Sequence, residues 1–240
     1  MPSYVSRPAR ILPALCLSVL LSLGLSGATA SASSKGTPPS KSAVYSAFLG
    51  DSYTFGVGAT RPTDGYAYLV AGAEHWTAKV VGLPGSGYVR VATHDGKNIA
   101  AGLPGVIAAQ PRVVIVACGH NDAMPNVDYR RTEAAALKDL GDLRAALPDA
   151  KIVVVGPIWL DGHPGKRVLF VRRAVHQAQR RIPGTLWIDP IAERWFTGSW
   201  RQRTGDDATM INYAAGHPDN RGYAHIAKLL EADLRAMGVQ

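Results

Sequence analysis

The stretch "AFLGDSYTFGVGAT" (Ala47–Thr60) joins an apolar run to a tight turn that presents a hydroxyl group. The run before Gly50 is rich in aromatic and aliphatic side chains, which is typical of a β-strand. Ser52 follows this strand directly, so it is either the N-cap of a following helix or a nucleophile. The strand end by itself is compatible with both roles.

Four more apolar runs predict strands later in the chain. The five expected strands are Ala43–Leu49, Lys79–Leu83, Arg112–Ala117, Lys151–Val155 and Thr185–Ile188. Two of these runs, "RVVIVA" and "KIVVV", are apolar at every position after the first, as strands are when both faces of a sheet are covered.

Helical patterns occupy the longer segments between and after these strands. The clearest is Tyr129–Leu147, and the segments "GKRVLFVRRAVHQAQRRI" and "DNRGYAHIAKLLEADLRAM" are two more. Alternating strands and helices predict an α/β fold with a parallel sheet between helical layers. Ligands bind at the carboxyl ends of the strands in such sheets. Ser52, the glycine-rich segment Gly82–Tyr88 and the Gly119–Asn121 segment all follow strands, so we expect them at one edge.

The N-terminus has the pattern of a secretory signal peptide. Arg7 and Arg10 precede an apolar run that ends near Ala28-Thr29-Ala30, an A-x-A cleavage pattern. We predict a signal peptide over residues 1–30, a flexible Ser/Pro-rich linker over 31–43 and one domain over 44–240. The expected location is therefore extracellular or the cell envelope, without stable membrane insertion of the mature chain.

Composition narrows the possible functions. The net charge is +8, but the basic residues are scattered apart from two Arg pairs, Arg172-Arg173 and Arg180-Arg181, and no nucleic-acid-binding motif accompanies them. Cys118 is the one cysteine left after signal removal, which excludes an intramolecular disulfide and predicts a buried thiol. No cluster has metal-ligand spacing, so no metal or cofactor is expected. No pattern indicates an oligomeric state.

A serine nucleophile needs a base and donors for the oxyanion that it creates. The candidate donors are the backbone N–H of Ser52, an N–H of the Gly82–Gly87 segment and the side-chain amide of Asn121. The candidate base is His217, which the pattern places in a loop directly before the last helix and next to Pro218.

Four blocks, "FLGDSYTFGVG", "GLPGSGY", "GHND" and "HPDNRGYAHIA", occur in this order, and with them the chain resembles the SGNH (GDSL-type) hydrolases. The resemblance implies that Ser52 is the nucleophile, that His217 is the general base and that Asn121 is an oxyanion donor. It also implies a donor glycine in the second block, for which we favour Gly85 over Gly87. The implied fold is a flavodoxin-like three-layer α/β/α sandwich on a five-stranded parallel sheet.

One position departs from the family pattern. The family usually has an Asp three residues before the catalytic His, and this chain has Ala214 there. An Asp at this position would orient the imidazole and stabilise its charged form. Three explanations are open: a backbone carbonyl takes this role in a Ser–His dyad, another acid does so, or activity is weakened. The candidate acids are Asp206, Asp207 and Asp189.

Other residues have competing interpretations. His163 in "WLDGHPGKR" imitates the last block, but we favour His217 as the base. Asp51 and Asp122 are expected to bond turn amides rather than to react. Four aromatic residues are candidates either for an apolar or sugar-stacking pocket or for the core: Tyr53, Trp159, Trp195 and Trp200.

The predicted function is that of a secreted serine esterase acting on a carboxylic ester, such as a short acyl ester or an acetylated glycan or lipid. Two alternatives follow from the same residues. One is an O-acyltransferase for cell-envelope carbohydrate, if water is excluded. The other is a catalytically weakened envelope-binding protein, which Ala214 and the basic charge suggest.

Overall fold

Five parallel strands form the central sheet of the computed structural model, which describes residues 45–199 and 201–239. Their order across the sheet is β2 (Thr77–Gly82), β1 (Tyr45–Gly50), β3 (Val113–Ala117), β4 (Lys151–Val155) and β5 (Thr185–Ile188). The predicted α/β class and five-stranded parallel sheet are confirmed, with small shifts at the ends of β1, β2 and β3. The expected signal peptide and linker lie outside the described residues.

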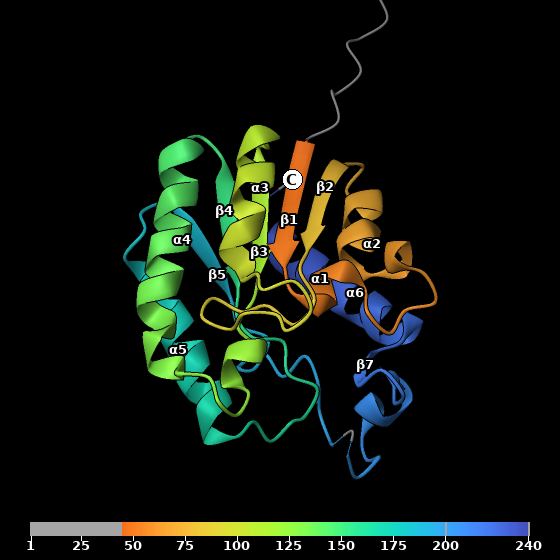
Figure 1. Cartoon of the computed structure of the whole chain (residues 1–240). Coiled ribbons are helices and arrows are strands. Elements are labelled where there is room, and N and C mark those ends of the chain that lie inside the picture. Colours follow the sequence, from red (N-terminus) through yellow and green to blue (C-terminus); the bar gives the residue numbers. More distant parts are fainter. Residues whose placement is uncertain (1–44, 200, 240) are drawn as a thin grey trace, which may run out of the picture. The chain divides into compact units, whose positions relative to one another are not determined.

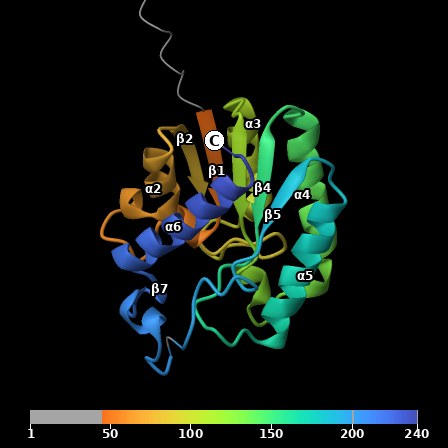
Figure 2. The ribbon, with the colours of Figure 1, turned by 180° about the vertical axis from the view of Figure 1, so that it is seen from behind.

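Helices cover both faces of this sheet. The helices are α1 (Ser52–Phe55), α2 (Tyr66–Ala73), α3 (Leu103–Ala108), α4 (Thr132–Ala146), α5 (Lys166–Arg180) and α6 (Asn220–Ala236). Figure 1 shows α3 and α4 in front of the sheet, and Figure 2 shows α6 crossing the opposite face. None of the described helices is long and apolar enough to span a bilayer.

The strand side chains alternate between two apolar cores. Phe48 and Ile115 pack with buried residues of α2 and α6, such as Val70 and Leu230. Their neighbours on the strands, including Leu49, pack with residues of α3, α4 and α5. The continuous apolar strands are thus covered on both sides, as the sequence pattern predicts.

Two local elements differ from the sequence prediction. The expected helix over Tyr129–Leu147 begins with a 3₁₀ turn over Tyr129–Arg131, whose first residues are capped by a hydrogen bond from the Arg130 N–H to the Asp128 side chain. His217 was expected in a loop, but it lies in the two-residue strand β7 (His217–Pro218). This strand pairs antiparallel with β6 (Ile211–Asn212), which fixes the backbone of His217 before α6 begins.

The turn after β1 requires glycine. A Cβ atom on Gly50 would overlap the Thr54 side chain and the Ala117 carbonyl oxygen. Glycine therefore lets α1 fold back against the end of β3. Ser52, the first residue of α1, therefore follows the carboxyl end of β1, and Figure 1 shows α1 at the lower end of that strand.

Candidate active site

Ser52 is the first residue of α1 and is buried. The N-cap of this helix is Asp51, whose carboxylate accepts a hydrogen bond from the Tyr53 N–H at 3.0 Å. The Ser52 Oγ atom instead lies 2.8 Å from His217 Nε2. The Ser52 hydroxyl thus lies beside an imidazole, which is the contact that a nucleophile and its base require.

The protonation of His217 follows from its second contact. Its Nδ1 atom lies 2.7 Å from the carbonyl oxygen of Ala215, and a carbonyl oxygen only accepts hydrogen bonds. Nδ1 therefore carries the proton, and Nε2 presents a lone pair to the Ser52 hydroxyl. This is the tautomer that a general base for Ser52 requires.

Two contacts hold the strand that carries His217. The Asn212 side chain, opposite His217 in the β6–β7 pair, donates to the Gly58 carbonyl at 3.0 Å. Gly58 has a φ of +96°, and a Cβ there would lie 2.9 Å from the His217 Cβ. The close approach of these segments depends on glycine at position 58. No pattern in the sequence indicates this pairing of Asn212 with Gly58.

Among the side chains that the structure describes, no candidate acid contacts His217 Nδ1. The Asp189 carboxylate accepts from Arg172 at 2.6 to 2.9 Å and from the Trp187 indole at 3.3 Å. The side chains of Asp206 and Asp207 lie outside the part that the structure describes. The Ala215 carbonyl accepts the hydrogen bond from His217 Nδ1 that an Asp side chain at position 214 would otherwise accept. This arrangement corresponds to a Ser–His dyad.

The three candidate oxyanion donors lie around one cavity with Ser52 and His217. The Ser52 N–H is at the first helical position, where it has no acceptor within the helix. Gly85 has a φ of +79°, and its N–H has no acceptor among the described residues. The Gly87 N–H donates to the Arg90 carbonyl at 2.9 Å, so the alternative glycine is already engaged.

The Asn121 amide is fixed by the glycine-rich loop. Its Nδ2 atom donates to the Ser86 carbonyl at 2.8 Å. An amide nitrogen has two hydrogens, so this bond orients the group and leaves the second hydrogen as a donor. Asn121 also lines the cavity beside Ser52, which is the position that an oxyanion donor needs.

Asp122 ties the glycine-rich loop to the turn after β3. Its carboxylate accepts from the backbone N–H groups of Tyr88, Val89 and Arg90 at 2.8, 2.8 and 2.9 Å. A Cβ on Gly87 would lie 2.5 Å from this carboxylate, so glycine permits the contact. Asp122 thus bonds turn amides, as the sequence analysis expected, and holds Gly85 near Ser52.

Burial changes the ionisation of groups behind and beside Ser52. It raises the pKa of the Asp51 carboxyl to about 7 and also raises the pKa of Asp122. Burial lowers the pKa of His120 to about 4, so this imidazole is neutral at pH 7. Cys118 is a buried free thiol, as predicted, and burial raises its pKa.

The cavity has a volume of about 390 Å³ and a largely apolar wall. The wall includes Tyr53, Val57, Pro84, Met124, Trp159 and Leu160. The rival base His163 is not part of it, since 87% of its side-chain surface is exposed. Trp195 belongs to the core, and Trp200 lies outside the described residues. Met124, Leu160 and Arg201, which also line the cavity, were missed in the sequence because no motif marks them.

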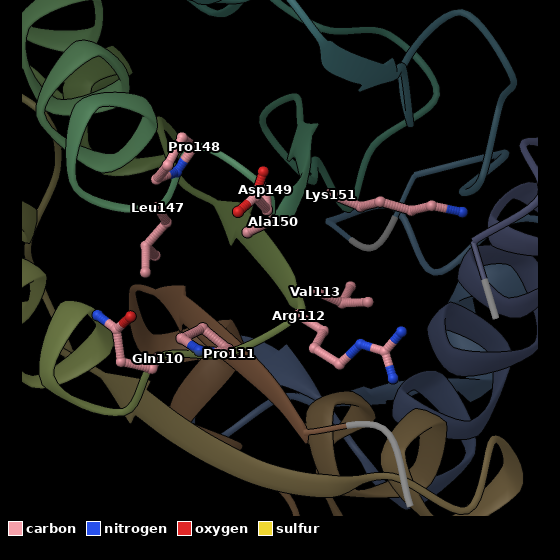
Figure 3. A pocket seen from close by; sticks show the side chains of 9 residues that line it. All are labelled: Gln110, Pro111, Arg112, Val113, Leu147, Pro148, Asp149, Ala150 and Lys151. Carbon is pink, nitrogen blue, oxygen red and sulfur yellow. The ribbon is translucent and has the colours of Figure 1, made fainter. Parts of the chain in front are cut away.

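A second cavity of about 370 Å³ lies at the opposite end of the sheet, where β3 and β4 begin. Figure 3 shows the nine side chains around it, which include Arg112 and Lys151. None of the nine is a serine, cysteine or histidine. The residues that line this cavity therefore include no Ser–His or Cys–His pair.

Comparison with known proteins agrees with the observed α/β fold. The model of the GDSL-like lipase/acylhydrolase family matches residues 48–225. The GDSL lipase Rv0518 of Mycobacterium tuberculosis (strain ATCC 25618 / H37Rv) is 28% identical over 196 residues, covering 75% of this chain and 77% of the relative.

Two solved structures illustrate the fold similarity. A family two carbohydrate esterase from Clostridium thermocellum, in complex with cellohexaose, has a TM-score of 0.64 at 18% identity, over 82% of this chain and 65% of that one. This chain thus spans just under two thirds of that protein. The salicylyl-acyltransferase SsfX3 from a tetracycline biosynthetic pathway has a TM-score of 0.61 at 17% identity, over 82% and 56% of the respective chains. At these identities the similarity shows a shared fold.

Proposed function

The chain belongs to the GDSL-like lipase/acylhydrolase family, and from that premise we propose that it is a secreted serine esterase that hydrolyses carboxylic esters through a Ser–His dyad. The observation that carries this proposal is the 2.8 Å contact between Ser52 Oγ and His217 Nε2. It is supported by the bond that holds the Nδ1 proton of His217 on the Ala215 carbonyl.

Acylation begins when Ser52 Oγ attacks the ester carbonyl carbon and its proton passes to His217 Nε2. The carbonyl oxygen becomes an oxyanion, which the N–H groups of Ser52 and Gly85 and the amide of Asn121 stabilise. Removing one such donor typically costs about 10²- to 10³-fold in turnover. The tetrahedral intermediate then collapses, and His217 returns the proton to the leaving alcohol.

Deacylation repeats these steps with water. His217 Nε2 takes a proton from a water molecule that attacks the acyl carbon, the same donors hold the second oxyanion, and Ser52 regains its proton as the acid leaves. The Ala215 carbonyl orients the imidazole throughout. It carries no full charge, so it stabilises the imidazolium less than a carboxylate would.

The cavity supports a small acyl group as the substrate class. A volume of about 390 Å³ is at the low end for ligand pockets and suits a short acyl chain together with part of the alcohol. The carbohydrate esterase similarity supports an acetylated glycan among the alternatives. The N-terminal pattern supports a signal peptide over residues 1–30, a linker over 31–43 and export.

The test is hydrolysis of p-nitrophenyl acetate and of its longer-chain homologues by the mature protein and by Ser52→Ala. We expect the wild type to prefer short chains and Ser52→Ala to lose activity. Full activity in folded Ser52→Ala contradicts the proposal. A folded wild type that hydrolyses none of these esters, yet binds envelope glycans, favours the binding-protein alternative.

Acyl transfer is the second candidate, and the similarity to an acyltransferase favours it. In transfer, a carbohydrate hydroxyl replaces water in the second half of the reaction. Analysis of the products with an added sugar acceptor separates the two functions. Acylated sugar as the main product identifies a transferase, and free acid identifies a hydrolase.

A further inference from the structure

Two histidines in the cavity share one hydrogen-bond arrangement. His217 Nδ1 is bonded to the Ala215 carbonyl, and His120 Nδ1 lies 3.0 Å from the Ile158 carbonyl. In both rings the carbonyl fixes the proton on Nδ1 and leaves Nε2 as an acceptor. The Nε2 atom of His217 accepts from Ser52, so a role for the same atom of His120 is the open question.

The Nε2 atom of His120 has no partner among the described residues. Some buried polar atoms of the described residues also lack a partner, such as the hydroxyl oxygens of Tyr53 and Ser86, but His120 Nε2 is not buried in this way. The atom is therefore accessible, and its ring lines the cavity that contains Ser52 and His217. An accessible acceptor beside the nucleophile is placed to meet substrate.

Neighbouring rings hold this imidazole in place. The Tyr53 ring lies 5.1 Å from His120 between centroids, and the Trp159 ring lies 4.9 Å away. Tyr53 in turn lies 5.3 Å from His217. A ring fixed in this way loses little conformational entropy when it binds a ligand. The low pKa of His120, about 4, makes it a poor base but keeps it a neutral acceptor.

Apart from the Ser52–His217 pair, the polar groups assigned to the reaction at this site are donors. The N–H groups of Ser52 and Gly85 and the Asn121 amide serve the oxyanion, and an ester oxygen has no hydrogen to offer to His120. A hydroxyl group elsewhere on the substrate does. A site with an acceptor for a hydroxyl discriminates against an analogue that lacks it, since the acceptor then stays unpaired.

Resting on the proposed function, we propose that His120 is a specificity-determining residue that accepts a hydrogen bond from a free hydroxyl on the alcohol part of the ester. The substrate class is then an acylated polyol or sugar in which a hydroxyl remains near the ester. The Trp159 ring, which also lines the cavity, offers an apolar face for the carbon skeleton of that alcohol.

The experiment compares glyceryl monoacetate with propyl acetate, which has the same acyl group and no free hydroxyl. The readout is the ratio of their kcat/KM values for the wild type, for His120→Phe and for His163→Phe. Phenylalanine keeps a ring at position 120 and removes the acceptor. The exposed His163 lies outside the cavity and supplies the matched control.

We expect the wild type to prefer glyceryl monoacetate and His120→Phe to lower the ratio about 10-fold, the effect of one hydrogen bond. His163→Phe is expected to keep the wild-type ratio. An unchanged ratio in folded His120→Phe overturns the inference and leaves the esterase proposal standing. Absence of activity toward both esters in the wild type counts against the esterase proposal instead.

A measurement on the unmodified protein covers the case in which His120→Phe does not fold or the wild type is inactive. Glycerol is added to saturation to protein with ¹⁵N-labelled histidine. We expect the Nε2 resonance of His120 to shift and that of His163 to stay. No shift at His120 overturns the inference.

Discussion

The cavity at the carboxyl ends of the strands has a volume of about 390 Å³, and the cavity at their amino ends has about 370 Å³. Both border β3: His120 and Asn121 lie beyond its end, and Arg112 lies before its start. The first contains a serine and a histidine within hydrogen-bond distance of each other. The second contains charged and aliphatic side chains and no such pair (Figure 3).

The difference shows that cavity size carries little information about function here. In a parallel sheet the segments that leave the strands converge at the carboxyl edge, where turns place polar side chains side by side. At the amino edge, Arg112 and Lys151 bond backbone carbonyls of β1 and of the C-terminal segment through Arg112 N and Lys151 Nζ. Those contacts join segments of the chain, and they are structural in kind.

The largest effect is expected when His217 is removed from the carboxyl-end cavity, and the matched change at the amino-end cavity removes the charge of Lys151. His217→Ala is expected to lower kcat for p-nitrophenyl acetate by about 10⁴-fold or more, since Ser52 loses its proton acceptor. Lys151→Ala at the amino-end cavity is expected to keep wild-type kcat. Loss of activity in Lys151→Ala with the fold intact would mean that the amino-end cavity, and not only the carboxyl-end one, takes part in catalysis.

Asn121→Ala tests the donor set of the carboxyl-end cavity. The Asn121 amide is held by Ser86 and is expected to bond the oxyanion but not the ground-state ester. The variant should therefore lower kcat by about 10²- to 10³-fold with little change in KM. A rise in KM with kcat unchanged would assign Asn121 to substrate binding rather than to the oxyanion.

The carboxyl-end site also differs from the amino-end cavity in having a buried acid, Asp51, next to Ser52. Burial raises the folded-state pKa of Asp51 from 3.8 to about 7, so between these pH values the folded state binds more protons than the unfolded state. Stability therefore falls as pH rises through this window. Asp139, whose pKa burial also raises to about 7, contributes in the same direction.

Asp51→Asn keeps an oxygen for the Tyr53 N–H and removes the titration. The wild type is expected to lose free energy of unfolding between pH 5 and pH 7.5. We expect Asp51→Asn to remove the share of this loss that comes from Asp51, on the order of 2 kcal/mol. Urea unfolding at the two pH values measures this. The matched control is Asp149→Asn, which makes the same substitution at an exposed position of the amino-end cavity. A slope that Asp51→Asn does not alter would show that Asp51 is not protonated there.

Much of the carboxyl-end site could be predicted from the sequence because its motifs are contiguous. Gly50-Asp51-Ser52 follows an evident strand, and Asn121 follows another, so the topology of a parallel sheet brings them together. The helices that the patterns left out are α1, α2 and α3. These are short, with four, eight and six residues, and α3 contains Pro104 and Gly105, which weaken a helical pattern.

The orienting contacts could not be predicted in the same way. Ala215, Ile158 and Ser86 act through backbone carbonyls, which every residue type possesses, so their letters in the sequence carry no signal. The bonds of Asp122 to the glycine-rich loop join positions more than 30 residues apart, and only the fold brings them together. The short β6–β7 pair is also below the length of a recognisable strand pattern.

Ala214→Asp restores the family residue and has the smallest expected effect. Position 214 is exposed, so a carboxylate there is solvated and its field is screened. The Nδ1 proton of His217 is already donated to the Ala215 carbonyl at 2.7 Å, so the new carboxylate finds no free N–H to accept. We expect kcat for p-nitrophenyl acetate to change by less than about threefold, since an exposed charge contributes well under 1 kcal/mol.

The pH profile of kcat/KM, recorded beside that of the wild type, gives this variant its second readout. An Asp that displaces the carbonyl and bonds the imidazole would stabilise the imidazolium, change the pH profile and increase kcat by about 10-fold or more. That outcome would mean that the Ala215 carbonyl is a weak substitute for a carboxylate in this site. Unchanged kcat and an unchanged profile would show that a backbone carbonyl suffices to orient the base of this dyad.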